Sequence, residues 1–168
     1  MRILIVDDHE VMRGGLRSLL GSLPEWEVCG EAVDGLEAVE KTKELRPDVV
    51  VLDINMPTLN GLEAVRLIRK EVPQTQVVML SRYEAAEMRS KALEAGACEY
   101  VPKSQNLARE LLAAIDEIVR RRWMSNPHAQ VSPTETSSQG TPQGTPAAGA
   151  EEFGAPHSKL ASNSGPQT

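Results

Sequence analysis

Acidic side chains follow two strongly apolar segments of this 168-residue chain. Asp7 and Asp8 come directly after the apolar residues 3–6, and Asp53 comes directly after residues 49–52. Short, almost continuously apolar runs are typical of strands covered by helices on both faces of a parallel sheet. The carboxyl ends of such strands share one edge, where a crevice opens at the point at which strand order reverses. If the order is 2-1-3-4-5, strands one and three are neighbours there, and the three carboxylates face each other.

This proximity predicts a bound cation. Two unit charges 4 Å apart repel by roughly 4 kcal/mol at an effective dielectric constant of 20. Without compensation, the pKa of at least one carboxyl group would rise and that group would stay protonated. Mg²⁺ prefers oxygen ligands and keeps several waters, which suits one or two carboxylates with a backbone carbonyl. The carboxylates therefore indicate a Mg²⁺ site, and the ion in turn indicates phosphate chemistry.

Two more strand ends add to this predicted site. Ser81 ends the apolar run 77–80, and Lys103 follows shortly after the run 98–101. In this setting Asp53 is the candidate nucleophile that forms an acyl phosphate. Mg²⁺ and Lys103 would neutralise charge on the transferring phosphoryl group. Ser81 would donate a hydrogen bond to a bound phosphate oxygen.

The elements that must position these residues alternate along the chain. A weaker apolar run at residues 26–32 completes a set of five, and amphipathic segments separate the runs. The segment from residue 107 onward shows one apolar face at helical spacing, formed by Leu107, Leu111, Ile115, Ile118 and Val119. Five successive β-α units predict an α/β protein with a parallel sheet and right-handed crossovers.

The composition changes abruptly after residue 123. Residues 124–168 are rich in Ser, Thr, Pro, Gly, Gln and Ala, and repeat Gln-Gly-Thr-Pro in tandem at residues 139–146. Their few large apolar residues cannot offset an ordering entropy of ~1–2 kcal/mol per residue. The sequence therefore predicts one folded domain over residues 1–123 and a disordered tail over residues 124–168.

Charge and cysteine content exclude several classes of protein. The net charge of −6 argues against direct nucleic-acid binding, which needs a basic face. The two cysteines, Cys29 and Cys98, lie far apart without metal-ligand neighbours, which suits a reduced cytoplasmic protein. The opening apolar run is too short for a signal peptide, and no segment approaches the ~20 apolar residues of a membrane span. We therefore expect a cytoplasmic protein with no membrane partner.

Four motifs at the predicted strand ends, in order, carry a family resemblance: VDDHE, LDINMPTLNGLEAVRLIR, MLS and EAGACEYVPKS. With them, residues 1 to about 122 resemble the receiver domain (CheY-like) of bacterial two-component response regulators. The resemblance implies a flavodoxin-like, doubly wound five-stranded parallel sheet of order 2-1-3-4-5. The amino-acid sequence around the first two motifs is most similar to that of the LuxR/NarL-type subfamily. Members of this subfamily usually carry a C-terminal helix-turn-helix output domain. Residues 124–168 show neither apolar periodicity nor a basic recognition helix.

The resemblance implies a role for each acid. Asp53 matches the phosphoacceptor that takes a phosphoryl group from a sensor histidine kinase. Asp8 matches a direct Mg²⁺ ligand, with Asp53 and the backbone carbonyl of Asn55 as the others. Asp7 matches the acidic partner that reaches the ion through water.

The resemblance also implies a set of switch residues. Ser81 and Lys103 match the switch hydroxyl and the lysine that pairs with the phosphate, and Tyr100 matches an aromatic residue that turns inward upon phosphorylation. Two positions depart from the family. Arg82 stands beside the phosphate where a small residue is usual, so it narrows access or adds a charge there. Ser104 replaces a proline that often follows the lysine.

The leading hypothesis is a phosphorylation-operated switch that acts by binding a downstream protein of unknown identity; a phosphorylation-dependent homodimer stays open. We expect no enzyme activity beyond the protein's own phosphorylation and dephosphorylation. One alternative is a receiver-like binding module that ignores phosphate, and another is a truncated transcriptional regulator. A phosphatase of the haloacid dehalogenase type is the rival enzyme, but it needs a second acid two residues after the nucleophile, where this chain has Asn55.

Overall fold

A computed structural model describes residues 1–124 of the chain. The predicted tail lies outside the described residues, except for Met124, which ends the last helix. Strands and helices alternate along the described part: β1 (Arg2–Val6), α1 (Glu10–Gly21), β2 (Glu27–Ala32), α2 (Gly35–Leu45), β3 (Val49–Asp53), α3 (Gly61–Glu71), β4 (Gln76–Ser81), α4 (Ala86–Ala95), β5 (Glu99–Pro102) and α5 (Leu107–Met124).

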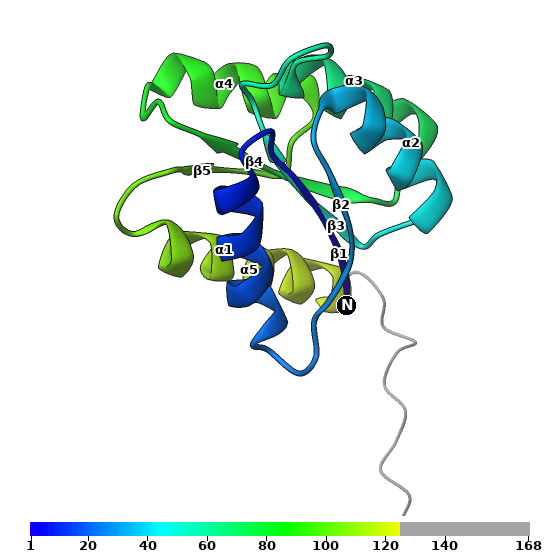
Figure 1. Cartoon of the computed structure of the whole chain (residues 1–168), viewed down its shortest axis with the longest axis vertical. Helices are drawn as coiled ribbons and strands as arrows, with labels where there is room; N and C mark the ends of the chain where they lie inside the picture. Colours follow the sequence, from blue (N-terminus) through cyan, green and yellow to red (C-terminus); the bar gives the residue numbers. More distant parts are fainter. Residues whose placement is uncertain (125–168) are drawn as a thin grey trace, which may run out of the picture. The chain divides into compact units, whose positions relative to one another are not determined.

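The five strands form one parallel sheet in the order β2-β1-β3-β4-β5. Helices α1 and α5 cover one face of the sheet, and α2, α3 and α4 cover the other (Figure 1). The predicted α/β class, strand order and doubly wound arrangement are thus confirmed. The strand order reverses beside β1, so β1 and β3 are neighbours at the expected crevice.

The sheet has an apolar core on each face. Along β1, Ile3 and Ile5 pack with the cluster of α1 and α5, whereas Leu4 and Val6 pack with the cluster of α2, α3 and α4. Each fully buried side chain of this kind contributes roughly 1.5–3 kcal/mol relative to exposure. All five residues of β3 are buried, which explains why its sequence is continuously apolar up to Asp53. The central strands therefore form a rigid base for the side chains at their ends.

A close backbone contact fixes the chain after β3. The N–H of Gly61 donates to the carbonyl of Ile54 (2.9 Å), and Asn60 caps α3 by accepting from the N–H of Glu63 (3.0 Å). A Cβ atom at Gly61 would lie 2.2 Å from the carbonyl oxygen of Asp53. Only glycine therefore allows α3 to begin against the end of β3.

We expect Gly61→Ala to lower the free energy of unfolding by about 1–3 kcal/mol, because either α3 or the end of β3 must shift. The matched control is Gly15→Ala in α1, where a Cβ meets nothing within 4 Å. That change should raise the free energy of unfolding by roughly 0.5–1 kcal/mol through the better helix propensity of alanine. Urea denaturation followed by circular dichroism measures both. Equal effects of the two substitutions would contradict this account of the contact.

Candidate functional site

Three carboxylates meet at the carboxyl edge of the sheet. Asp7 and Asp8 directly follow β1, and Asp53 is the last residue of β3. One carboxylate oxygen of each lies within 4.8 Å of those of the other two. Asp7 and Asp53 are buried, with 0% and 2% of their surface exposed, whereas Asp8 is exposed. The structure therefore brings together the acids that the sequence placed at neighbouring strand ends.

Lys103, just after β5, joins two of these acids. Its Nζ donates a hydrogen bond to Asp7 Oδ2 (2.6 Å) and lies 2.8 Å from Asp53 Oδ1 as an ion pair. The lysine side chain is only 5% exposed. Asp53 Oδ1 is buried, and apart from this ion pair it has no hydrogen-bond partner in residues 1–124. One buried cation thus faces three acids, and the cluster has an excess of negative charge.

Burial raises the pKa of Asp53 above its usual value, although the Lys103 ammonium opposes the shift; Asp7 and Asp8 raise this pKa further. A carboxyl group whose pKa is higher in the folded than in the unfolded protein destabilises the fold once the pH exceeds its unfolded pKa. A cation beside Asp53 would offset this cost. Carboxylate oxygens with an excess of negative charge and a buried oxygen without a hydrogen bond fit a hard divalent cation.

The predicted switch residues hold the loop after β4. Ser81 is buried, and its Oγ accepts a hydrogen bond from the backbone N–H of Tyr83 (3.1 Å). Tyr100, only 5% exposed, donates its hydroxyl hydrogen bond to the carbonyl of Tyr83. The sequence gives no signal for Tyr83, because its contacts use the backbone N–H and carbonyl, which every residue type except proline provides. Ser81 and Tyr100 are thus connected through one peptide segment.

Two further predicted residues, Asn55 and Arg82, are exposed. Asn55 lies in the loop after β3 and is exposed. Arg82 is exposed and lines a pocket of about 300 Å³ together with His9, Val11, Met12, Gly15 and Lys103. Arg82 and Lys103 thus line the same pocket, and Arg82 brings an exposed positive charge to it.

The family model of the response regulator receiver domain matches residues 3–116. The chain belongs to this family. The receiver domain is the phosphorylation-operated switch of two-component systems, so the fold and function expected from the resemblance are confirmed at the level of the domain. No helix in residues 1–124 is long and apolar enough to span a membrane.

Individual relatives agree with this assignment. The chain is 46% identical over 124 residues to a protein-glutamate methylesterase/protein-glutamine glutaminase of Pyrococcus abyssi, a match that covers 72% of this chain and 33% of that protein. It resembles the crystal structure of the response regulator domain of Thermotoga maritima CheB with a TM-score of 0.67 and 42% identity, covering 71% of this chain and 96% of that one. A two-component response regulator of the LuxR family from Aurantimonas sp. SI85-9A1 gives a TM-score of 0.68 and 38% identity over 71% of this chain and 85% of that one.

The receiver thus spans about a third of the length of the methylesterase relative. The expected closeness to the LuxR/NarL-type subfamily has only weak support, because a CheB receiver is at least as similar in sequence as a LuxR-family receiver.

We expect Lys103→Met to lower the free energy of unfolding by about 3–5 kcal/mol at neutral pH, because it leaves Asp7 and Asp53 buried without their cation. The control is Arg82→Met, which removes an exposed cation of the same pocket and should change stability by less than about 0.5 kcal/mol. Thermal and urea unfolding in metal-free buffer measure both variants. A Lys103→Met protein as stable as the wild type would show that the ion pairs do not stabilise the fold.

Proposed function

We propose that Asp53 accepts a phosphoryl group from the phosphohistidine of a sensor kinase. The observation that carries this proposal is the environment of Asp53, whose buried Oδ1 lacks a hydrogen bond and lies 2.8 Å from Lys103 inside an acidic cluster. In the transfer an Asp53 oxygen attacks phosphorus, the O–P bond forms, and the bond from phosphorus to the donor breaks.

A Mg²⁺ ion fits this site. Asp8 and Asp53 would hold it through carboxylate oxygens, Asn55 through its backbone carbonyl and Asp7 through water. When bound, the ion supplies positive charge beside the oxygens of the transferring phosphoryl group. The excess negative charge of the cluster and the raised pKa of Asp53 support this assignment.

The protein's own residues then bind the product. Lys103 is buried between Asp7 and Asp53, so its ammonium can pair with a phosphate on Asp53 without moving far. The Ser81 hydroxyl, at the end of the strand beside β3, would donate to a phosphate oxygen. Burial of Asp53 keeps bulk water from the acyl phosphate.

Phosphorylation would be transmitted through the loop after β4. When Ser81 turns toward the phosphate, the N–H of Tyr83 loses its acceptor, and the loop that Tyr100 also holds must rearrange. A partner that binds one arrangement better reads the change. We propose that this partner is a protein rather than a nucleic acid, in the cytoplasm. A phosphorylation-dependent homodimer remains one form of that partner.

We further propose that the domain acts by binding rather than by turning over free phosphate esters. Asn55, two residues after Asp53, has no carboxylate to act as a general acid or base. Sustained release of phosphate from p-nitrophenyl phosphate would contradict this part of the proposal.

Incubation with acetyl phosphate and Mg²⁺ should add one labile phosphate to the protein, read as intact mass. Asp53→Ala should abolish the gain, and removal of Mg²⁺ by EDTA should reduce it at least tenfold, because the cluster then lacks its neutralising charge. A gain that persists in Asp53→Ala would place the modification elsewhere. If the wild type gains nothing, Arg82→Ala is the next variant, and failure of both would overturn the proposed phosphorylation.

Hydrogen exchange tests the proposed path of the signal. Acetyl phosphate with Mg²⁺ should increase amide exchange at Tyr83, because Ser81 no longer accepts from that N–H. In Ser81→Ala this amide should exchange fast from the start and should not respond to phosphorylation. An unchanged protection of Tyr83 in phosphorylated wild-type protein would exclude this route.

A further inference from the structure

The Asp8 side chain has no partner of its own within residues 1–124. Asp7, beside it, accepts hydrogen bonds at its carboxylate from the N–H of His9 (2.9 Å) and from Lys103 (2.6 Å). The exposed Asp8 carboxylate makes no hydrogen bond or ion pair with any residue of the described part of the chain. Its position therefore depends on the backbone that carries it, above all on the peptide group that links Asp7 to Asp8.

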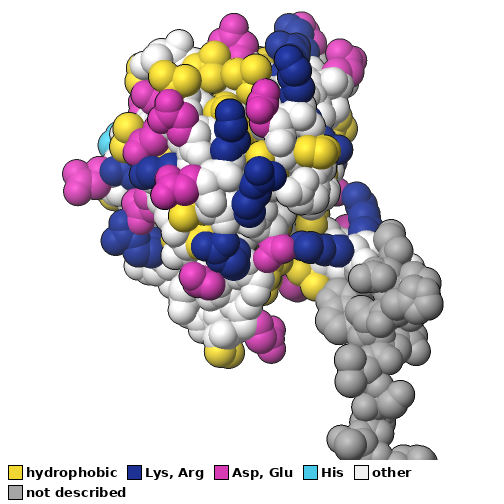
Figure 2. All heavy atoms as spheres, turned by 90° about the vertical axis from the view of Figure 1, so that its right-hand side faces the viewer, with side chains coloured by type: hydrophobic (Ala, Val, Ile, Leu, Met, Phe, Trp, Pro, Cys, Tyr) yellow, Lys and Arg dark blue, Asp and Glu magenta, His cyan; other side chains and the backbone are white. Residues whose placement is uncertain are grey.

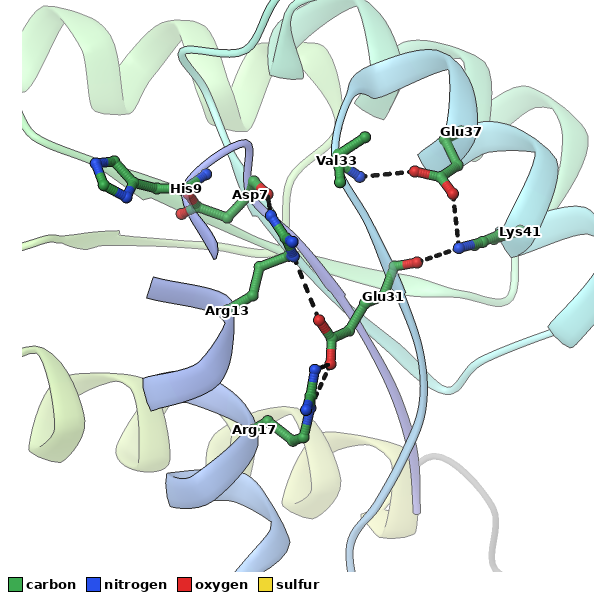
Figure 3. A network of polar contacts seen from close by, with 8 residues as sticks. All are labelled: Asp7, His9, Arg13, Arg17, Glu31, Val33, Glu37 and Lys41. Carbon is green, nitrogen blue, oxygen red and sulfur yellow. Dashed lines mark hydrogen bonds and ion pairs between the residues drawn. The ribbon is translucent and has the colours of Figure 1, made fainter. Parts of the chain in front are cut away.

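Arg13 of α1 holds this peptide group. One guanidinium nitrogen, Nη1, donates to the carbonyl oxygen of Asp7 (2.9 Å), and Nε donates to Glu31 Oε2 on β2 (3.3 Å) (Figure 3). The Arg13 side chain is only 15% exposed. The carbonyl of Asp7 belongs to the peptide plane whose other end is the nitrogen of Asp8, so a fixed carbonyl fixes the direction in which Asp8 leaves β1.

Glu31 is itself held in place, which makes it a firm support for Arg13. Its carboxylate also pairs with Arg17, one turn further along α1. Its backbone carbonyl accepts from Lys41 of α2, which pairs with Glu37 (2.7 Å), as Figure 3 shows. The contacts thus run from α2 through the edge strand β2 and α1 to the peptide group of the acid pair.

We propose that Arg13 is a positioning residue for the divalent-cation site, acting through the Asp7 carbonyl on the placement of Asp8. The inference rests on the proposed Mg²⁺ site and adds a residue to it that does not touch the ion. Residues outside the ligand set that orient the ligands change metal affinity by ~10–100-fold when they are replaced.

The effect of Arg13 is one of geometry rather than of charge. Its guanidinium is paired with Glu31, and the atom that it contacts at the acid pair is a neutral carbonyl oxygen rather than a carboxylate. Loss of Arg13 would therefore free the peptide group without removing a counter-ion from the three acids. Lysine has a single ammonium on a flexible stem and cannot make both contacts in the same fixed geometry.

Arg17 provides a matched control within the same network. It pairs with the same carboxylate and lies on the same helix, but it makes no hydrogen bond or ion pair with Asp7, and its side chain is 60% exposed. Arg13→Ala and Arg17→Ala both remove one positive charge and one ion pair of Glu31. Only Arg13→Ala also releases the Asp7 carbonyl.

The experiment is a Mg²⁺ titration of the unphosphorylated wild type and both variants by isothermal calorimetry. Arg13→Ala should weaken Mg²⁺ binding at least tenfold, Arg13→Lys should restore part of the loss, and Arg17→Ala should stay within twofold of the wild type. Phosphorylation by acetyl phosphate at varied Mg²⁺ gives a second readout. The Mg²⁺ concentration for half-maximal rate should rise in Arg13→Ala, while the rate at saturating Mg²⁺ returns close to that of the wild type.

Two results would overturn the positioning role: unchanged Mg²⁺ affinity in folded Arg13→Ala, or an equal loss in Arg17→Ala, which would assign the effect to charge. If Arg13→Ala does not fold, Glu31→Gln replaces it, since this change weakens the support of Arg13 and should also lower Mg²⁺ affinity. Absence of Mg²⁺ binding by the wild type would instead refute the metal site of the proposed function, so the two failures are distinguishable.

Discussion

The ion pairs of Lys103 with Asp7 and Asp53 tie together three strand ends that are distant in sequence. Lys103 follows β5, Asp7 follows β1, and Asp53 ends β3, and the hydrogen bond from Lys103 to Asp7 spans 96 positions of the chain. A buried charge is costly unless it is paired, and here the pairing is incomplete, because one ammonium serves a cluster of three acids. The site is therefore poised to respond to a change of charge, whether from a cation or from a phosphoryl group.

Such a site needs a rigid support, and the sheet provides it. The acids and the lysine can be held close together only if the strands that carry them do not move apart. Apolar clusters on both faces of the sheet fix β1, β3 and β4, and the contact of Gly61 with the carbonyl of Asp53 fixes the start of the loop beyond β3. The free energy gained by burying the core thus maintains an arrangement of like charges that would otherwise relax.

The part of the site that the sequence predicted follows from one geometric rule. Parallel strands place their carboxyl ends at one edge, so residue types at the ends of apolar runs locate Asp7, Asp53, Ser81 and Lys103. Contacts that use backbone atoms cannot be predicted from residue types in this way. The carbonyls of Asp7 and Tyr83 accept from Arg13 and Tyr100, and no residue type at positions 7 or 83 signals this.

The role of Arg13 could not be predicted from the sequence for a second reason. Its partner Glu31 lies 18 residues away on β2, and an arginine on a helix is more often solvated than engaged with an edge strand. The pairing becomes visible only when α1 is placed against β2.

The helices differ in how firmly they are held, and this bears on where a switch can act. Helix α3 has a side-chain N-cap and four buried residues, among them Val65 and Ile68. Helix α4, directly after the loop held by Ser81 and Tyr100, has no side-chain cap and buries only Ala92 and Ala95. Fewer and smaller buried side chains mean a smaller free energy for local rearrangement.

The free energy that a two-state switch requires also favours α4 and the loop before it as the parts that move. Loss of the hydrogen bond between Tyr83 and Ser81 is worth only about 0.5–1.5 kcal/mol. A shift of a two-state equilibrium from 1:99 to 99:1 needs about 5.5 kcal/mol. The remainder must come from the charge-assisted contacts of a phosphate with Lys103 and Ser81, and it must act on an element that moves at low cost. In residues 1–124 the loop after β4 and α4 combine both conditions, since they connect directly to Ser81 and are weakly anchored to the core.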